Sequence, residues 1–385
     1  MEYKPFGRLD WKGSILGFGA MRLPVRDNKM ADIDEPEVTR MVRYAIDHGV
    51  NYVDTAYPYH EGQSEPCIGR VLKDGYREKV KLATKMPTWF IMAPADFDRY
   101  LDEQLTRLQT DTIDFYLLHG LTRNFWPHLR DLGVLRWAEG AIADGRIGHL
   151  GFSFHDDFPS FKEIVDAYDN WTLAQIQYNY MDTNCQAGTE GLRYAAAKGI
   201  AVVIMEPLRG GQLTKEPPPR NVAEVLAKAP KRRSPAEWAL QWIWDQPEVS
   251  VVLSGMTAME HVVENVACAE RSAGNALSSD EIKVVDQVRE IYKNLSPIPC
   301  TDCQYCMPCP NGVLIPRIFE LYNETFMYDD PRVPRFRYRG PTGLKEEQRG
   351  DKCTECGECV ELCPQNIAIP EWLQKAHELL GPRKK

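Results

Sequence analysis

Short apolar runs alternate with amphipathic stretches along the first 295 residues of the chain. Such runs, bounded by turn residues, are typical of β-strands, and the stretches between them repeat apolar residues at helical spacing, as at 35–49 and 236–246. The predicted strands are residues 14–24, 51–56, 80–85, 113–119, 147–153, 173–179, 200–206 and 249–255.

Eight strands that alternate with helices over about 280 residues predict an α/β fold of the (β/α)8, or TIM barrel, type. A doubly wound sheet is the alternative, but no predicted strand is followed by the GxGxxG turn of such folds. We expect the barrel to span residues 1–277 and a connecting helix to span 278–295, with a small separate module at 296–385. The basic, proline-rich stretch 215–235 is predicted to be a solvent-exposed loop and helix.

Active sites of such barrels lie at the carboxyl ends of the strands, so polar residues there are candidates. They are Asp54, Tyr59, Lys85, His119, Ser153, His155, Gln175, Asn179 and Glu206. Each alone has a structural explanation: an aspartate can cap a turn, a tyrosine can pack, a lysine can extend to solvent, and a histidine can be a satisfied core residue. For each residue taken alone, the structural explanation is favoured.

Cysteine spacing separates the last 90 residues from the rest. Cys67, Cys185 and Cys268 are isolated and are interpreted as small core residues, whereas the other eight cysteines fall between 300 and 363. They form one C-x2-C-x2-C-x2-C-P run and one C-x2-C-x2-C-x3-C-P run. Zinc would be crowded by so many cysteines, and disulfides are disfavoured in a chain without an export signal.

The two runs resemble a two-cluster ferredoxin module, which implies a ferredoxin-like domain with two 4Fe–4S clusters. By that resemblance Cys300, Cys303, Cys306 and Cys363 bind one cluster, and Cys353, Cys356, Cys359 and Cys309 bind the other. Between the runs we expect a helix at 316–328 and, at 329–343, a loop whose arginines pair with carboxylates.

The barrel segment resembles the aldo-keto reductases over roughly residues 10–270. The matching stretches are NYVDTAYPYH, LATK, FYLLH, AQIQYN, MEPLRGG and VVENV. The resemblance implies a catalytic tetrad of Asp54, Tyr59, Lys85 and His119. Tyr59 would donate a proton to the carbonyl oxygen, Lys85 would adjust that phenol, Asp54 would hold Lys85, and His119 would orient the substrate.

The same resemblance implies a site for NAD(P)H. Its residues would be Gly19, Ala20, Met21, Ser153, Gln175, Met205, Pro207, Leu208, Gly255, His261, Glu264 and Asn265. Two positions depart from the family: Phe154 replaces the usual asparagine after the serine, and Met205 replaces the aromatic residue that stacks on the nicotinamide. Gly255 and His261 stand where NADP-specific members have lysine and arginine, which favours NADH.

These observations predict an iron–sulfur oxidoreductase that reduces a carbonyl or oxidises an alcohol with NAD(P)H. The alternative is an electron-transfer oxidoreductase that uses a flavin or a partner protein, with the barrel as a binding platform. A formal charge of −9 argues against nucleic acid or membrane as a partner, and a redox partner protein is possible. Without an apolar signal core, the protein is expected to be cytoplasmic.

Overall fold

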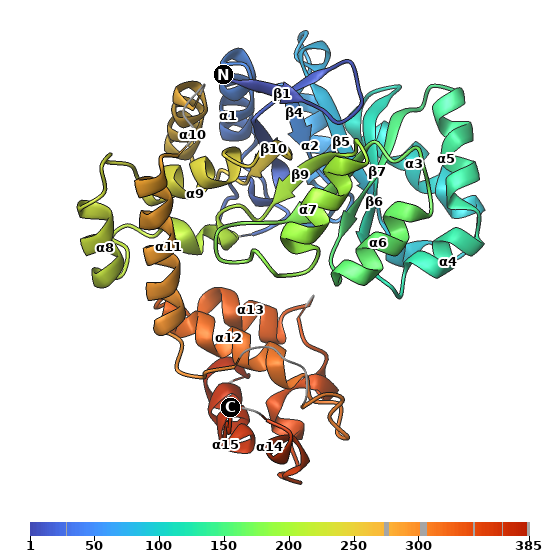
Figure 1. Ribbon diagram of the computed structural model, residues 1–385. Helices are drawn as coiled ribbons and strands as arrows, with labels where there is room; N and C mark the ends of the chain where they lie inside the picture. The colour runs from blue at the N-terminus through green and yellow to red at the C-terminus, as the bar shows by residue number, and fades with distance from the viewer. Residues whose placement is uncertain (28, 273–276, 301–305, 342, 364, 383–385) are drawn as a thin grey trace. The chain divides into compact units, whose positions relative to one another are not determined.

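The computed structural model describes residues 1–385 except 28, 273–276, 301–305, 342, 364 and 383–385. The chain forms two compact units, one of residues 1–209 and 233–278 and the other of residues 210–232 and 279–385 (Figure 1). Among the described helices, none is both long and apolar enough to cross a membrane.

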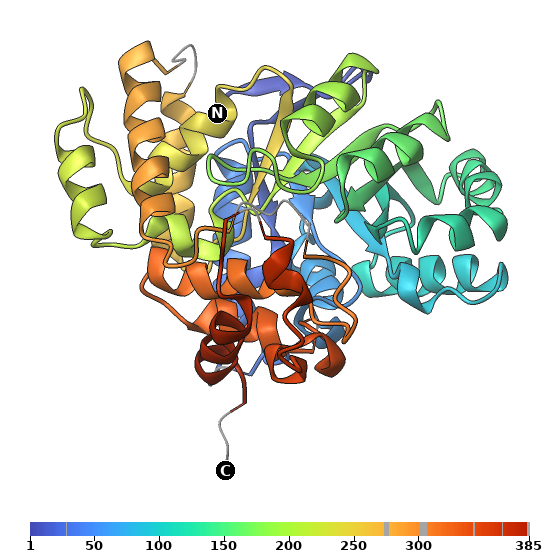
Figure 2. The same cartoon turned by 60° about the horizontal axis from the view of Figure 1, so that its bottom comes forward.

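The first unit contains a closed barrel of parallel strands with helices around it (Figure 2), which confirms the predicted fold class. In barrel order the strands are β10 (Val249–Ser254), β3 (Leu16–Gly19), β4 (Tyr52–Asp54), β5 (Lys81–Met86), β6 (Ile113–Leu121), β7 (Ile147–Phe154), β8 (Leu173–Gln177) and β9 (Ala201–Met205). All eight predicted strands are present, although several are shorter than their apolar runs because the chain leaves the barrel at the strand ends.

Amphipathic helices cover the barrel. They are α1 (Glu35–Asp47), α2 (Ser64–Val71), α3 (Ala95–Leu108), α4 (Trp126–Asp131), α5 (Val134–Ala143), α6 (Phe158–Asp166), α7 (Gly188–Ala197), α9 (Pro235–Trp244) and α10 (Met259–Arg271). In α1 a proline and two glutamates occupy the first turn, and Val38, Met41, Val42 and Ala45 form one buried stripe at helical spacing.

A short antiparallel hairpin of β1 (Tyr3–Pro5) and β2 (Lys12–Ser14) precedes the barrel. Its turn supplies Phe6, which packs with Tyr52 and Phe115 inside the barrel at ring-centroid distances of 5.9 and 4.8 Å. Tyr52 begins β4, so Phe6 fills the barrel at the amino ends of the strands. The candidate site residues lie at the opposite ends.

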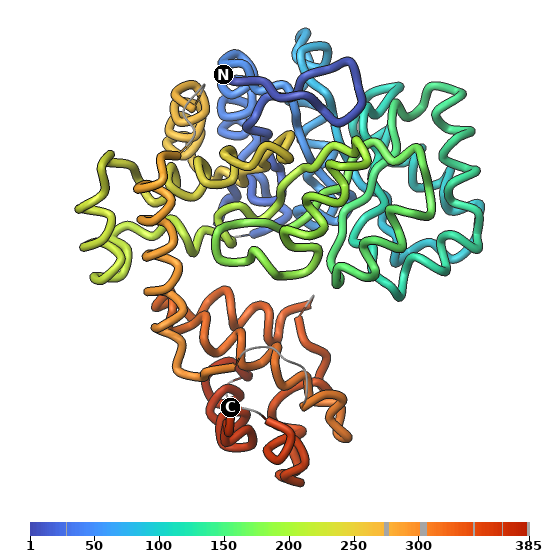
Figure 3. The backbone as a smooth tube through the Cα atoms, in the orientation of Figure 1, coloured from blue at the N-terminus to red at the C-terminus, as the bar shows by residue number. Residues whose placement is uncertain are grey.

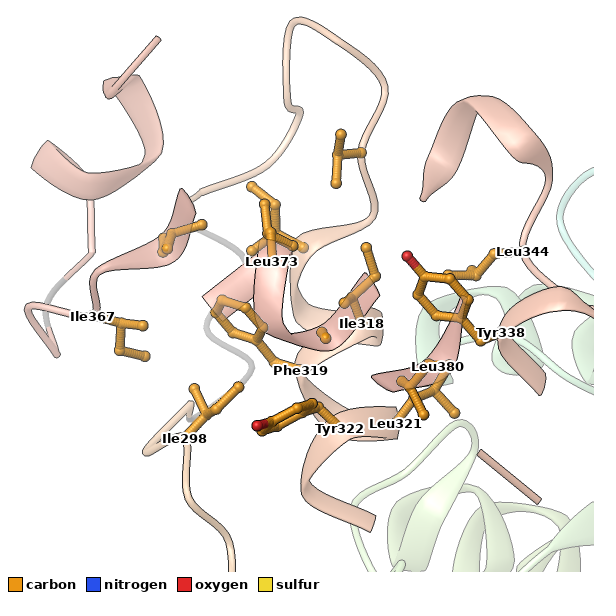
Figure 4. Packing of buried hydrophobic residues seen from close by; sticks show 14 residues of the cluster. Ile298, Ile318, Phe319, Leu321, Tyr322, Tyr338, Leu344, Ile367, Leu373 and Leu380 are labelled. Atoms are coloured by element: carbon orange, nitrogen blue, oxygen red, sulfur yellow. The ribbon is translucent and has the colours of Figure 1, made fainter. Parts of the chain in front are cut away.

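The second unit has its own hydrophobic core. Its helices are α8 (Arg220–Ala227), α11 (Ser279–Asn294), α12 (Ile315–Met327), α13 (Arg332–Arg339), α14 (Glu358–Glu361) and α15 (Ile369–Leu380). Ile318 and Phe319 of α12 pack with Leu373 of α15, and Tyr338 of α13 completes the cluster (Figure 4). Of the seven clustered cysteines that the structure describes, six pack against this core.

Two segments differ from the sequence-based expectation. The 215–235 stretch contains the predicted helix, α8, but it is not wholly solvent-exposed, because α8 packs beside α11 (Figure 3), Val222 is buried, and Lys231 lies 3.9 Å from the buried Glu281 carboxylate. Residues 215–232 of this stretch therefore belong to the second unit, and residues 233–235 belong to the first.

The 329–343 stretch contains a helix, α13, where a loop was expected. Asp330 accepts a hydrogen bond from the Arg332 amide at the helix start, and Pro334 and Tyr338, four residues apart, are buried on one face. Its arginines do pair with carboxylates, since Arg337 contacts Glu324 at 3.3 Å.

Candidate active site and cluster ligands

Neighbouring strands bring Asp54 and Lys85 together. Asp54 ends β4 opposite Ala83 of β5, and Lys85, two residues further along β5, points to the same side of the sheet. The Lys85 Nζ donates to Asp54 Oδ1 at 2.6 Å and to the Thr55 carbonyl at 2.7 Å. Both charged side chains are at most 3% exposed, so this is a fully buried ion pair.

Tyr59 and His119 complete the group. Tyr59 begins the short helix η2 (Tyr59–Gly62) after β4, and its hydroxyl lies 3.5 Å from Lys85 Nζ. His119 lies near the end of β6, with its ring 6.0 Å from the Tyr59 ring and nearly perpendicular to it. The structure therefore gathers the four predicted tetrad residues at the carboxyl ends of β4, β5 and β6.

The surroundings set the protonation states of these groups. Burial disfavours the Lys85 ammonium, but Asp54 and Tyr59 outweigh burial and raise its pKa, so Lys85 stays charged. Burial raises the pKa of Tyr59 above 10.0 against the opposing effect of Lys85, so the phenol is protonated. Burial, Lys85 and His155 together hold the pKa of His119 well below its usual range, so its imidazole is neutral. A buried cation beside a protonated phenol and a neutral imidazole can stabilise and protonate a developing alkoxide.

The residues predicted to bind the nicotinamide nucleotide lie at other strand ends around the same barrel mouth. Gly19 ends β3, and Ala20 and Met21 follow it in η1 (Ala20–Arg22). Met205 ends β9 and precedes Pro207 and Leu208, while Gly255 follows β10. Ser153 of β7 and Gln175 of β8 are register partners.

Gln175 fits a nicotinamide carboxamide. Its side chain is 2% exposed, and its Oε1 has no hydrogen-bond partner among the described residues. A buried acceptor without a donor is costly, and an amide N–H of a bound group would satisfy it. Ser153 is already engaged, because its Oγ accepts from the Gly120 amide at 2.8 Å.

Three of the four predicted adenosine-end residues lie on α10, and the fourth, Gly255, follows β10. Asn265 donates to Ser254 Oγ at 3.0 Å, and Glu264 accepts a hydrogen bond from the Ser234 hydroxyl at the start of α9. His261 lies 3.3 Å from the Thr257 hydroxyl, exposed at the surface. The barrel's own residues thus hold Glu264 and Asn265 in place.

Seven of the eight predicted cluster ligands lie in the described part of the chain, and Cys303 lies outside it. Burial raises the pKa of the Cys359 thiol, and the charges of Cys353, Cys356 and Cys309 add to this effect. A pocket lined by Cys306, Cys309, Cys353, Cys356 and Cys359 opens between them. Cys309 thus lines one pocket with the second cysteine run, but so does Cys306, which the resemblance assigns to the other cluster, so the crossed ligand set stays a prediction.

Within the described ranges, no three histidine, cysteine, aspartate or glutamate side chains converge on one point. A 4Fe–4S cluster uses a wider set of thiolates, because its four irons separate the ligands, and such a set of cysteines lines the pocket.

Sequence reasoning missed several residues that shape the site. The Thr55 carbonyl is the second partner of Lys85, and Trp89 lies 5.0 Å from the His119 ring. His60, next to Tyr59, hydrogen-bonds through both ring nitrogens. A histidine directly after the tyrosine was visible in the sequence, but backbone partners leave no sequence pattern.

Comparison with known proteins finds two family matches along the chain. The aldo/keto reductase family matches residues 15–290, and a 4Fe-4S dicluster domain matches residues 299–368. L-Galactose dehydrogenase of Arabidopsis thaliana is 26% identical over 77% of this chain and 97% of its own length. NADH-specific methylglyoxal reductase of Escherichia coli is 26% identical over 72% of this chain and 96% of its own.

Solved structures agree with this fold. An aldo-keto reductase of Bacillus halodurans in its holo form has a TM-score of 0.62 and 27% identity, over 74% of this chain and 96% of its own. An aldo-keto reductase of Klebsiella pneumoniae in complex with NADPH has a TM-score of 0.61 and 24% identity, over 75% of this chain and 96% of its own. The chain is an oxidoreductase that belongs to the aldo/keto reductase family, with a 4Fe-4S dicluster domain after the barrel.

Proposed function

We propose that the barrel interconverts a small carbonyl compound and its alcohol with NAD(P)H, and that two 4Fe–4S clusters exchange electrons with a redox partner protein. The observation that carries the catalytic part is the buried Lys85, 2.6 Å from Asp54 and 3.5 Å from the Tyr59 hydroxyl. A buried lysine–aspartate ion pair contributes little to the stability of the fold, because replacing such a pair by apolar residues is often neutral or stabilising.

Each residue has a distinct role in this proposal. Tyr59 donates its phenolic proton to the carbonyl oxygen, and the Lys85 ammonium stabilises the phenolate that is left. Asp54 keeps Lys85 charged and oriented, and the neutral His119 hydrogen-bonds the carbonyl oxygen. When bound, the nicotinamide nucleotide supplies or accepts the hydride. In the oxidative direction the same phenolate takes the proton of the alcohol.

We propose NADH as the preferred nucleotide. The positions expected at the adenosine end hold Gly255, His261, Glu264 and Asn265, with no lysine or arginine among them. A carboxylate such as Glu264 repels a 2′-phosphate and accepts hydrogen bonds from ribose hydroxyls. The name of the Escherichia coli relative, an NADH-specific reductase, agrees with this choice.

The second unit would hold the clusters through its two cysteine runs, with Cys309 and Cys363 each serving the cluster of the other run. We propose a functional division into the barrel (1–277), the connecting helix (278–295) and the cluster domain (296–385). A cytoplasmic location suits such clusters, because cysteines stay reduced in that compartment.

The decisive experiment is the visible spectrum of anaerobically purified protein, followed by assays of a carbonyl panel with NADH and NADPH. Broad absorption that bleaches with dithionite, about eight irons per chain and Tyr59-dependent turnover are the expected results. Zinc in place of iron would contradict the cluster proposal. A bound flavin and no Tyr59-dependent turnover would instead support the electron-transfer alternative, with the barrel as a binding platform.

A further inference from the structure

The backbone directly after Tyr59 is in an unfavourable conformation. His60 and Glu61 have φ values of 54° and 55°, inside the left-handed region that glycine adopts freely and side-chain-bearing residues avoid. Two such residues in succession cost free energy and persist only where the surroundings hold them. This turn directly follows Tyr59, whose hydroxyl lies 3.5 Å from Lys85 Nζ.

The His60 side chain supplies the constraint. Its Nε2 accepts from the Leu23 amide at 3.0 Å, and its Nδ1 lies 2.8 Å from the Met30 carbonyl. A neutral imidazole with its proton on Nδ1 satisfies both partners at once. The ring is 3% exposed, and burial lowers the pKa of His60, so this neutral form holds at neutral pH.

Both partners of His60 lie on the segment between β3 and α1. This segment begins with Ala20 and Met21, which are proposed to contact the nucleotide. It is also attached to the Tyr59 side by the Ser64 hydroxyl, which donates to the Ala20 carbonyl at 3.1 Å. Of the three hydrogen bonds that attach this segment, the His60 side chain makes two and Ser64 makes one. His60 directly follows the proposed proton donor, Tyr59.

The tethered segment reaches across the barrel mouth. Arg22, adjacent to Leu23, lies along Gly255 and pairs with Glu206 at 3.0 Å. Glu206 follows β9 and directly succeeds Met205. A continuous series of contacts thus joins Tyr59, through His60 and Leu23, to Arg22 and the loop after β9.

We propose that His60 is a positioning residue that fixes residues 20–23, which include the proposed nucleotide contacts Ala20 and Met21, and the proton donor Tyr59 relative to each other. This inference rests on the proposed function, because it assigns nucleotide and proton-donor roles to the two parts that His60 joins. Loss of the imidazole should weaken nucleotide binding and slow proton transfer together, although His60 contacts neither reactant.

Two variants separate this role from backbone strain. His60→Gly removes both hydrogen bonds but suits the left-handed backbone, so it would be harmless or stabilising if strain were the whole story. His60→Gln keeps the unfavourable backbone and returns an acceptor that reaches Leu23. His48→Gln is the control, because His48 is exposed and its ring lies 2.8 Å from a carbonyl of its own helix.

The first measurement is hydrogen exchange at the Leu23 amide in full-length protein without nucleotide. In His60→Gly the amide should exchange at least about tenfold faster, since it loses a buried acceptor, and His60→Gln should recover much of the protection. Unchanged exchange at Leu117 in β6 shows that the barrel is intact. Unchanged protection of Leu23 in His60→Gly would overturn the inference.

The second measurement separates binding from chemistry. His60→Gly should raise the Kd for NADH about tenfold and lower kcat as well, and His60→Gln should restore both in part. A variant whose Leu23 amide exchanges rapidly but whose Kd for NADH and kcat equal those of the wild type would overturn the inference while leaving the proposed function intact. Wild-type protein that binds no nicotinamide nucleotide would overturn the proposed function and, with it, the role assigned to His60.

Discussion

The Lys85 ammonium is held inside the barrel by two oxygen atoms, and one of them carries the compensating charge. Removing one partner of a buried ion pair costs about 3–5 kcal/mol, because the remaining charge is left uncompensated. We therefore expect Asp54→Asn to destabilise the fold by an amount in this range at neutral pH, and to abolish most turnover. Urea unfolding at pH 7 measures the first effect. A variant as stable as the wild type would show that Lys85 is neutral in the folded protein.

Tyr59→Phe removes the proposed proton donor and leaves the ring in place. Carbonyl reduction should fall by at least about a hundredfold, with little change in NADH affinity, because general acid catalysis contributes at least that factor. Tyr57→Phe is the matched control, since the Tyr57 hydroxyl contacts Glu103 at 3.3 Å and is not part of the tetrad. Equal activity of the two variants would exclude the tetrad mechanism.

The pH profile tests the same phenol in the unmodified protein. Because burial raises the pKa of Tyr59 above 10.0, its proton is present at neutral pH and is lost only as the pH rises past that value. Carbonyl reduction limited by proton transfer should therefore stay level from about pH 7 to pH 9 and decline above pH 10. A decline centred near neutral pH would assign the proton to another group.

At the scale of elements, a buried polar network joins two helices to two strands. Glu65 of α2 accepts from Thr84 of β5 at 2.6 Å and from Gln104 of α3 at 2.5 Å. Gln104 also donates to the Lys85 carbonyl at 3.1 Å and accepts from the Tyr116 hydroxyl of β6 at 2.6 Å. This network thus connects helices α2 and α3 to β5, the strand that carries Lys85.

Glu65 makes the stability of these elements depend on pH. Burial raises its pKa above the ordinary 4.5, so the folded protein binds the proton more tightly than the unfolded chain. Its contribution to stability is therefore complete below that value and declines as the pH rises through the raised pKa. Relative to Glu65→Gln, the wild type should lose unfolding free energy as the pH rises above 4.5. A constant difference would contradict the prediction.

The elements were predictable from sequence where the signal is local. Runs such as 113–119 became strands, and the glutamates and proline at the start of α1 marked a helix that the structure contains. The helix α13 was missed because its pattern of arginine and aromatic residues has little apolar periodicity, and only Pro334 and Tyr338 are buried. The hairpin β1–β2 was missed because strands of three residues carry almost no pattern.

The same distinction applies within the site. Asp54, Tyr59, Lys85 and His119 were named because their types and strand-end positions suit one reaction. Contacts through backbone atoms, such as the hydrogen bond from the Leu23 amide to His60, depend on which loops lie next to each other in space. Loop contacts follow from tertiary packing and not from local composition, so they became visible only in the structure.

At the scale of the whole molecule, the cysteine runs predict separable clusters. Cys356→Ala removes one ligand from the second run, so iron should fall from about eight to about four atoms per chain. Cys268→Ala is the control, because that cysteine is buried in α10 of the barrel unit and should leave the iron content unchanged. Iron that stays at about eight in Cys356→Ala would remove Cys356 from the ligand set.

Joining the two units in one chain raises a question of electron counting. A nicotinamide nucleotide gives up two electrons together as a hydride, whereas a 4Fe–4S cluster accepts one electron at a time. The tetrad can move a proton, but none of its four side chains can store a single electron at an accessible potential.

We therefore expect NADH alone to bleach the clusters slowly, on a timescale far longer than carbonyl turnover, and dithionite to bleach them at once. Stopped-flow absorption of anaerobic, flavin-free protein measures both rates. Tyr59→Phe should leave the slow NADH-driven bleaching unchanged, since no proton transfer to substrate is involved. Rapid and stoichiometric bleaching by NADH alone would mean that the chain itself divides the hydride into single electrons, and the barrel and cluster domain would then share one redox reaction.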